Sequence, residues 1–176
     1  MILRKINAAI SLLTTLFLMN HAIFNAVWML SHGSITKHSN GMSFILVPAM
    51  AVHAIISIIL AVLGHKGAEK RKCNSYQKLN KATIIQRVSG ILLILFTALH
   101  VAGAVGGIKP PGVIHAILPP LFFIITLMHV AVSTSKAFIT LGIGNATVIK
   151  AIDISVKVIC GITLIADVTG FYLHLC

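Results

Sequence analysis

Long apolar stretches separated by short polar segments dominate the pattern along this chain of 176 residues. Five of these stretches reach the length that a membrane-crossing helix needs, which is about 20 mostly apolar residues. They cover residues 6–31, 41–64, 82–106, 113–138 and 150–173. Lipid offers no hydrogen bonds to the backbone, and the alternating segments of a membrane β-barrel are missing. The pattern therefore predicts an all-α integral membrane protein, a bundle of five transmembrane helices forming one domain over residues 1–176.

Composition agrees with this prediction and excludes other classes. Hydrophobic residues make up 57% of the chain and charged residues only 10%, whereas a soluble domain is about a quarter charged. A soluble globular enzyme and a disordered chain are both excluded. The three cysteines, Cys73, Cys160 and Cys176, are too few for a disulfide framework. No CxxCH sequence occurs, which excludes covalently attached c-type haem.

The first stretch has two interpretations. Its basic start and apolar middle are also features of a secretory signal peptide. The apolar run continues past Trp28, however, and no small-x-small cleavage sequence follows it. We therefore expect a retained helix.

Basic residues are distributed unevenly about the predicted bundle. The chain has 14 Lys and Arg residues against 3 Asp and Glu, a formal net charge of +11. All of the basic residues except Lys37 and Lys109 fall on one side of the five predicted spans. By the positive-inside rule, the N-terminus and the loop 65–81 face the cytoplasm and the C-terminus lies outside. This topology accounts for the positive charge, so we expect the lipid bilayer as a partner and no nucleic acid.

Histidine is the most informative residue type, with nine in an apolar chain. His21, His53, His100 and His129 fall inside the first four spans, one in each. Ionisable groups within membrane helices are costly and usually functional. The other five lie near span ends or in loops, where we expect wet interfacial side chains; they are His32, His38, His65, His115 and His174.

The four histidines in span interiors sort into two depths. At a rise of 1.5 Å per residue, His53 and His129 lie about 16 and 13 Å from the cytoplasmic ends of their helices. His21 and His100 lie about 22 and 27 Å from those ends on the same basis. The sequence thus predicts an inner pair, His53 with His129, and an outer pair, His21 with His100.

Two imidazoles at one depth on facing helices are suited to holding an iron porphyrin between them. Each supplies one axial nitrogen, which saturates the iron and favours electron transfer over O2 binding. We therefore expect two non-covalent b haems. A zinc or copper site would need three or four converging ligands. The alternative is that the histidines only form interhelical hydrogen bonds, in a haem-free scaffold or small transporter.

Four segments together resemble a known family. They are QRVSGILLILFTALHV (86–101), HVAVSTSKAFITLGI (129–143), MNHAIFNA (19–26), and His53 followed by CNSYQKLNKATIIQRVSG (73–90). In the first segment, His100 follows Gly90 by ten residues, the spacing of a haem-ligand helix. The chain resembles the five-helix, dihaem cytochrome b membrane subunit of succinate dehydrogenases and fumarate reductases.

This resemblance implies a function and partners. His53 and His129 would ligate the proximal haem, and His21 and His100 the distal haem. The subunit would transfer electrons between a membrane quinone or quinol and an iron–sulfur subunit docked on the cytoplasmic face. That subunit is linked to a flavoprotein, so no catalytic residue is expected in this chain. The implied location is the plasma (inner) membrane of a prokaryote. A related alternative is an orphan quinol-oxidising cytochrome b with another electron partner.

Several residues are candidates to support the haems. Gly90 lacks a Cβ, so it would let a porphyrin lie close to the backbone, or simply let two helices pack closely. Arg87, Ser89 and Lys136 are candidates to bind a propionate of the proximal haem, while the two basic residues are equally suited to anchoring at the interface. Asn25 is a candidate for a propionate of the distal haem or for a contact with a neighbouring helix.

The last span carries two carboxylates. Asp153 and Lys157 are four residues apart, and we expect them to form a surface ion pair. Asp167 has no cation four residues away in either direction. It is a candidate to accept a quinol proton, or else an outer-interface residue in contact with water.

Overall fold

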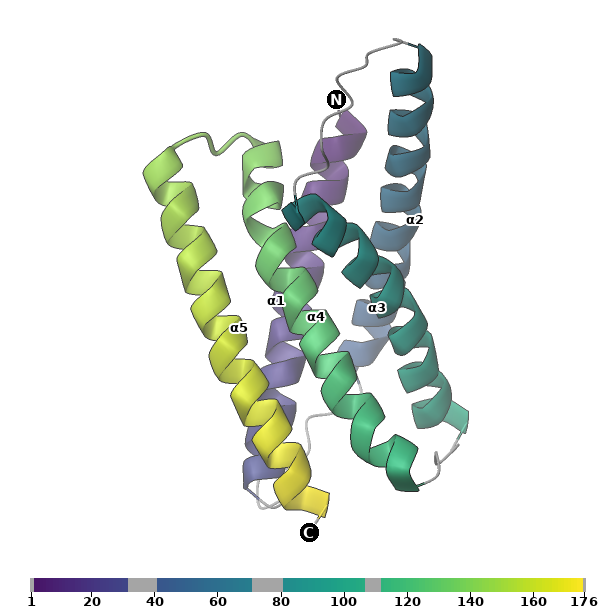
Figure 1. Ribbon diagram of the computed structural model, residues 1–176, viewed down its shortest axis with the longest axis vertical. Helices are drawn as coiled ribbons and strands as arrows, with labels where there is room; N and C mark the ends of the chain where they lie inside the picture. Colours follow the sequence, from purple (N-terminus) through teal and green to yellow (C-terminus); the bar gives the residue numbers. More distant parts are fainter. Residues whose placement is uncertain (1, 32–40, 71–80, 107–111, 176) are drawn as a thin grey trace.

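The computed structural model describes residues 2–31, 41–70, 81–106 and 112–175. Within these ranges the chain forms five long helices and no strand (Figure 1). They are α1 (Ile2–Leu30), α2 (Gly41–Lys70), α3 (Lys81–Gly106), α4 (Gly112–Leu141) and α5 (Ala146–Leu175). The prediction of an all-helical chain is confirmed, and the helices extend a few residues beyond the predicted spans at most ends.

Four of these helices are long and apolar enough to cross a membrane. The qualifying segments are Ile2–Leu30, Ile45–Leu63, Thr83–Gly103 and Ala116–Leu141. The fifth helix carries Lys150, Asp153, Lys157 and Asp167 along its length, and its assignment as a span stays a prediction. The orientation of the termini also stays a prediction. Part of the basic loop used to predict it, residues 71–80, lies outside the described residues, as do His32 and His38.

Two helices occupy the centre of the bundle. Helices α1 and α4 contact each other, and both contact α5 on one side. On the other side, α2 packs on α1 and α3 packs on α4 (Figure 1). Over the described residues, the backbones of α1 and α3 do not approach each other closely along their lengths, and neither do those of α2 and α4. The helices that carry each predicted histidine pair therefore lie diagonally across the group α1–α4.

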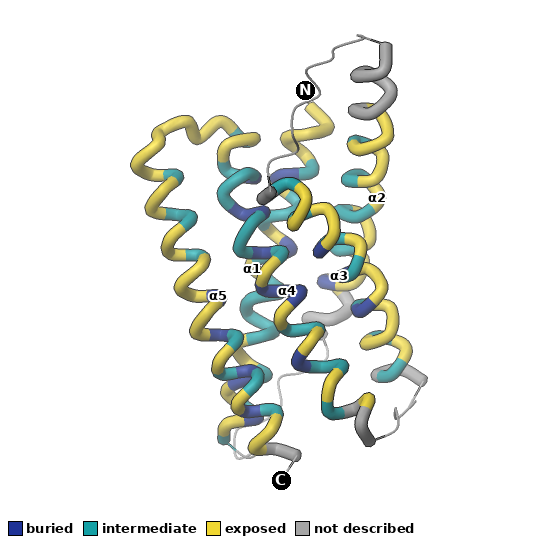
Figure 2. The backbone as a smooth tube through the Cα atoms, in the orientation of Figure 1, coloured by how far each residue is buried: buried dark blue, intermediate teal, exposed yellow. Residues whose placement is uncertain are grey.

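Two apolar clusters hold the helices together. One joins α3 to α4 through Leu93, Phe96 and Ile125, and Met50 of α2 packs against it. The other joins α4 to α5 and α1 and is centred on Leu127, Val130 and Cys160; Leu18, Met19, Ala131, Val156 and Leu164 pack against it. Burial follows these seams (Figure 2).

The outward faces are apolar as well. Ile91 and Ile165 are 69% and 70% exposed, and many other large aliphatic side chains are exposed. Exposed positions occur along every helix (Figure 2). Soluble monomers rarely expose contiguous apolar surface of this extent. Lipid chains are the solvent that such a surface fits, in agreement with the membrane-spanning segments.

A tight turn connects α4 to α5. Gly142 has a φ of +110°, a conformation that other residues adopt only with strain. Its N–H donates to Ile139 O at 3.1 Å and the N–H of Ile143 donates to Phe138 O at 3.2 Å, which closes the end of α4. The Asn145 side chain then caps α5 by accepting from the N–H groups of Thr147 and Val148 at 2.9 and 3.2 Å.

We expect Gly142→Ala to destabilise the protein by about 1–3 kcal/mol because a Cβ is strained at this φ. The measurement is the midpoint of thermal unfolding in detergent. The matched control is Gly144→Ala: at both glycines an added Cβ meets no atom within 4 Å, and only Gly142 has a positive φ. Equal midpoints for the two variants would contradict the expectation.

Candidate functional site

The ring of His129 is seated against α3. Ser89 is completely buried, and its Oγ lies 3.0 Å from His129 Nδ1. The Ser89 hydroxyl also donates to Gln86 O at 3.2 Å. Because a hydroxyl has one hydrogen to donate, this bond leaves its oxygen to accept from a protonated Nδ1. The other ring nitrogen, Nε2, then carries the lone pair that a metal requires.

Gly90 completes this seat. A Cβ built at Gly90 would lie 3.2 Å from His129 Cε1 and 3.6 Å from Nδ1. A contact of 3.2 Å is closer than a Cβ normally allows, so any larger residue would push the ring away from α3. The structure thus places Gly90 and Ser89 against the ligand candidate itself.

His53 lies near this ring on α2. The two imidazoles of the predicted inner pair are within the range at which positive charges on both would repel each other. His53 Nδ1 is buried and has no hydrogen-bond partner among the described residues. Asn7 of α1 lies beside the His53 ring. One turn further along α2, the Ser57 hydroxyl oxygen accepts from Asn7 Nδ2 at 3.1 Å, which fixes this part of α2 against α1.

The two outer histidines lie on α1 and α3. The exposed ring of His100 packs on Phe122 of α4, with centroids 5.4 Å apart and planes tilted by 35°. Phe122 in turn stacks on Phe96 at 6.2 Å. His21 is half-buried on α1. These two helices do not pack on each other over their described residues, and the pairing of His21 with His100 stays a prediction.

The arrangement of the inner pair is compatible with axial haem ligation. Directly packed helices lie about 8–10 Å apart, and two imidazoles on opposite faces of one iron need helices farther apart than this. Helices α2 and α4, which do not pack directly over their described lengths, meet that condition. A haem-ligating histidine also donates its second ring nitrogen to a fixed acceptor, as His129 can to Ser89. Among the described residues no group of three or more His, Cys, Asp or Glu converges.

Lys136 and Asn25, two of the candidates for binding haem propionates, have other partners in the structure. Lys136 Nζ donates to Thr83 Oγ1 at 3.2 Å and to Gln86 Oε1 at 2.9 Å, which links α4 to α3. An ammonium has three donors, so one remains for a carboxylate. Arg87 is exposed. The amide of Asn25 donates to the backbone oxygen of His21 at 2.7 Å.

Asp167 is completely buried, and it is not a residue in contact with water. Its exposed fraction is 0%, and neither carboxylate oxygen has a hydrogen-bond partner among the described residues. It belongs to a buried stripe on α5 that includes Cys160 and Thr163. One turn further on, a Cβ at Gly170 would lie 3.0 Å from Met29 Cβ, so this stripe is pressed against α1. The residues of this stripe are three or four positions apart in the sequence, and this spacing could have indicated that Asp167 is buried.

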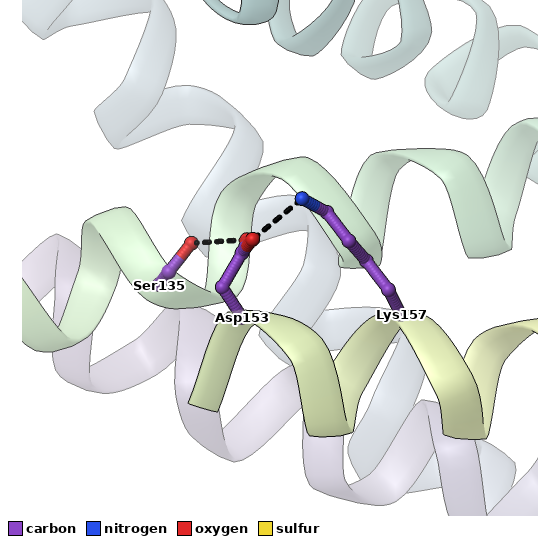
Figure 3. Close-up of polar contacts among 3 residues, drawn as sticks. All are labelled: Ser135, Asp153 and Lys157. Atoms are coloured by element: carbon purple, nitrogen blue, oxygen red, sulfur yellow. Dashed lines mark hydrogen bonds and ion pairs between the residues drawn. The ribbon is translucent and has the colours of Figure 1, made fainter. Parts of the chain in front are cut away.

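The predicted ion pair of Asp153 and Lys157 is confirmed, with Nζ and Oδ2 2.5 Å apart. Sequence reasoning missed its third member. The hydroxyl of Ser135 on α4 donates to Asp153 Oδ1 at 3.2 Å (Figure 3). Sequence reasoning also missed the links of Asn7 to Ser57 and of Lys136 to Gln86, since single polar residues on separate helices carry no shared spacing.

No protein-family model, curated protein or solved structure matches this chain. Its function must therefore be argued from the residues and contacts described above.

We expect replacement of Asp167 by Val to raise the thermal unfolding midpoint. A buried polar group without a partner costs about 1–3 kcal/mol, and an apolar side chain of similar size removes that cost. Unfolding of the purified protein in one detergent measures the effect. As a control, Asp153→Val removes a carboxylate that has partners and should not stabilise. A lower midpoint for Asp167→Val than for the parent chain would show that the carboxyl has a stabilising partner.

Proposed function

We propose that this protein is a membrane-anchor cytochrome b subunit. It binds two b haems through paired histidines and transfers electrons between a membrane quinone or quinol and a docked iron–sulfur and flavoprotein module. The observation that carries the proposal is the arrangement of His129, with Nδ1 beside Ser89, its ring against Gly90, and His53 close by.

Each residue of the inner site has a defined task in this proposal. His129 and His53 would each hold the haem iron through one ring nitrogen. Ser89 holds the His129 ring in the tautomer that leaves Nε2 unprotonated. Gly90 lets that ring lie against α3, and the third donor of Lys136 neutralises a haem carboxylate. The bound haem supplies reversible one-electron chemistry, and two histidine ligands leave no position for O2.

The outer pair is placed like the inner pair, on the two helices across the other diagonal of the group α1–α4. His21 and His100 lie on helices that do not pack directly over their described residues, as His53 and His129 do. Phe122 and Phe96 support the His100 ring with aromatic contacts. A haem between His21 and His100 would lie deeper from the cytoplasmic face than the inner haem and would extend the electron path across the bilayer.

The membrane and the partners follow from surface chemistry. The exposed apolar faces fit a lipid bilayer. The excess of Lys and Arg assigned to one side favours an orientation with that side in the cytoplasm. The plasma membrane of a prokaryote is the location that the family resemblance implies. A basic cytoplasmic face also suits an acidic surface on the docked iron–sulfur subunit.

One observation supports a second candidate function. The contact between Ser89 and His129 is itself an interhelical hydrogen bond, which is what a haem-free helical scaffold would use its histidines for. The scaffold needs no haem, so the presence of haem separates the two functions.

We expect the protein, purified after expression with haem supplied, to contain two b haems per chain. A reduced-minus-oxidised spectrum and haem quantification give the measurement. His53→Ala and His129→Ala should each lose one haem and keep the other, because each removes one axial ligand. The control His65→Ala, at a predicted span end, should keep both. Folded parent protein without a b-type absorption band would overturn the proposal and favour the scaffold.

We expect Ser89→Ala to weaken haem binding at the inner site by about 10–100-fold, the usual effect of losing the partner of a ligating histidine. Haem titration of the apoprotein measures the affinity. The control is Thr134→Val, which removes a hydroxyl whose one acceptor among the described residues is Val130 O on its own helix, at 2.8 Å. Equal affinities in the two variants would show that Ser89 does not orient the ligand.

A further inference from the structure

An open groove lies between α4 and α5 at the end of the bundle where the turn at residues 142–145 joins them. Its volume is about 450 Å3, and its lining includes Ser135, Ile139, Ile143, Ile149, Lys150 and Asp153. The N-terminus lies at the same end of the bundle (Figure 1), which is the end predicted to face the cytoplasm. We call this space the turn-end groove, and none of the functions assigned above uses it.

The charges at this groove are unequal. Asp153 Oδ1 accepts from the Ser135 hydroxyl at 3.2 Å, and Oδ2 pairs with the ammonium of Lys157 (Figure 3). The charge of Asp153 is thereby balanced within the protein. Lys150 also lines the groove, and it has no ion pair among the described residues. The groove therefore presents one positive charge that a ligand can neutralise.

Lys157 indicates the direction in which the surroundings become polar. Its side chain lines a second, apolar groove farther along the seam of α4 and α5, whereas its ammonium contacts Asp153, one helical turn nearer to the turn end. Basic side chains at a membrane keep the stem against apolar groups and direct the charge toward the headgroups. This arrangement indicates that headgroups lie on the turn side of Asp153 and acyl chains on the other side.

The second groove is suited to an acyl chain. Its volume is about 220 Å3, and its lining includes Ile124, Leu127, Met128, Ala131, Gly161 and Leu164. On α4 the linings of both grooves follow intervals of three and four residues from 124 to 139, so they share one helix face. From Lys150 to Leu164 the rise along α5 is about 21 Å. One leaflet of the hydrocarbon core is about 15 Å thick, so the seam is long enough for an acyl chain.

We propose that the turn-end groove binds one anionic phospholipid, with its phosphate against the ammonium of Lys150 and an acyl chain along the seam of α4 and α5. The cytoplasmic leaflet supplies anionic lipids, and basic residues at its surface attract them. A zwitterionic headgroup fits less well, because it brings a second cation next to Lys150 and Lys157. An uncharged ligand would leave the charge of Lys150 unbalanced. This inference goes beyond the proposed function and does not depend on haem.

The test is a lipid titration of the purified full-length protein in detergent, followed by native mass spectrometry. We expect the first phosphatidylglycerol to bind about fivefold more tightly than phosphatidylcholine with the same acyl chains. Equal binding of the two lipids would overturn the proposal. Glycerol phosphate has the same anionic group without acyl chains, and it should not displace the lipid. Displacement by an equal concentration of glycerol phosphate would assign the groove to a free anion instead.

Charge variants separate a defined site from the general attraction of a basic surface. Lys150→Gln should weaken phosphatidylglycerol binding about fivefold, the usual contribution of one basic residue next to anionic lipid. The control is Lys5→Gln, because Lys5 is exposed on α1 at the same end of the bundle and does not line the groove. Equal weakening in the two variants would show that the attraction is diffuse and would overturn the proposal.

Replacement of Asp153 should act in the opposite direction. Asp153→Asn removes a negative charge from the lining and keeps the size of the side chain, so phosphatidylglycerol should bind more tightly than to the parent chain. General damage to the groove would weaken binding, so the sign of the effect separates the two causes. Weaker binding in Asp153→Asn would contradict the proposed charge complementarity.

A pair of tryptophan variants tests whether the lipid occupies the groove itself. Ile139 and Ile154 are 53% and 52% exposed, and Ile139 lines the groove whereas Ile154 does not. Ile139→Trp should abolish the preference for phosphatidylglycerol over phosphatidylcholine, and Ile154→Trp should keep it. The same preference in both variants would place the lipid elsewhere. A parent protein that contains no haem but keeps this preference would overturn the proposed function and support the lipid site.

Discussion

Polar side chains inside an apolar bundle need partners, and this constraint governs the structure at every site described above. Leaving a buried polar group unpaired costs about 1–3 kcal/mol in protein interiors. The chain meets the constraint by linking helices in pairs: Asn7 to Ser57, Lys136 to Gln86, and Ser135 to Asp153. Among the described residues, the buried polar atoms without a partner belong to His53, Asp167, Asn20, Thr97 and Thr126. The first two are candidates for binding something other than protein.

The hydrogen bond between Ser89 and His129 shows how a link between two helices can also orient a candidate ligand. Ser89 is buried without any exposed surface, yet its hydroxyl has two partners, one on its own helix and one on α4. The hydrogen bond between Ser89 and Nδ1 fixes the imidazole of His129 and leaves Nε2 available for another partner. The same contact in a haem-free bundle would only hold α3 to α4. The presence of His53 nearby, on a helix that does not pack directly on α4 over its described length, is what favours a ligand between them.

The sequence predicted the helices well and the contacts of the site only in part. Apolar length determines a membrane helix almost alone, so five helices appear close to their predicted ends. The inner pair of histidines was predicted from depth, because axial rise is nearly constant in a helix. Which side chains meet in the site depends also on how each helix is rotated about its axis. Packing between helices sets that rotation, and the sequence did not predict it. Ser89 and Gly90 therefore lie against the His129 ring, and Asp167 is buried rather than in contact with water.

The central position of α4 has a consequence for the order of assembly. Helices α1, α4 and α5 contact one another, whereas α2 and α3 each pack on one of these three. During synthesis α2 and α3 are made before α4 and α5, so the close packing of α3 on α4 can form only after α4 has been made. Membrane helices can insert first and associate later, and here association must wait for the C-terminal third of the chain. Nascent chains that stall before residue 112 would hold α1 and α2 together and leave α3 accessible to chaperones and proteases.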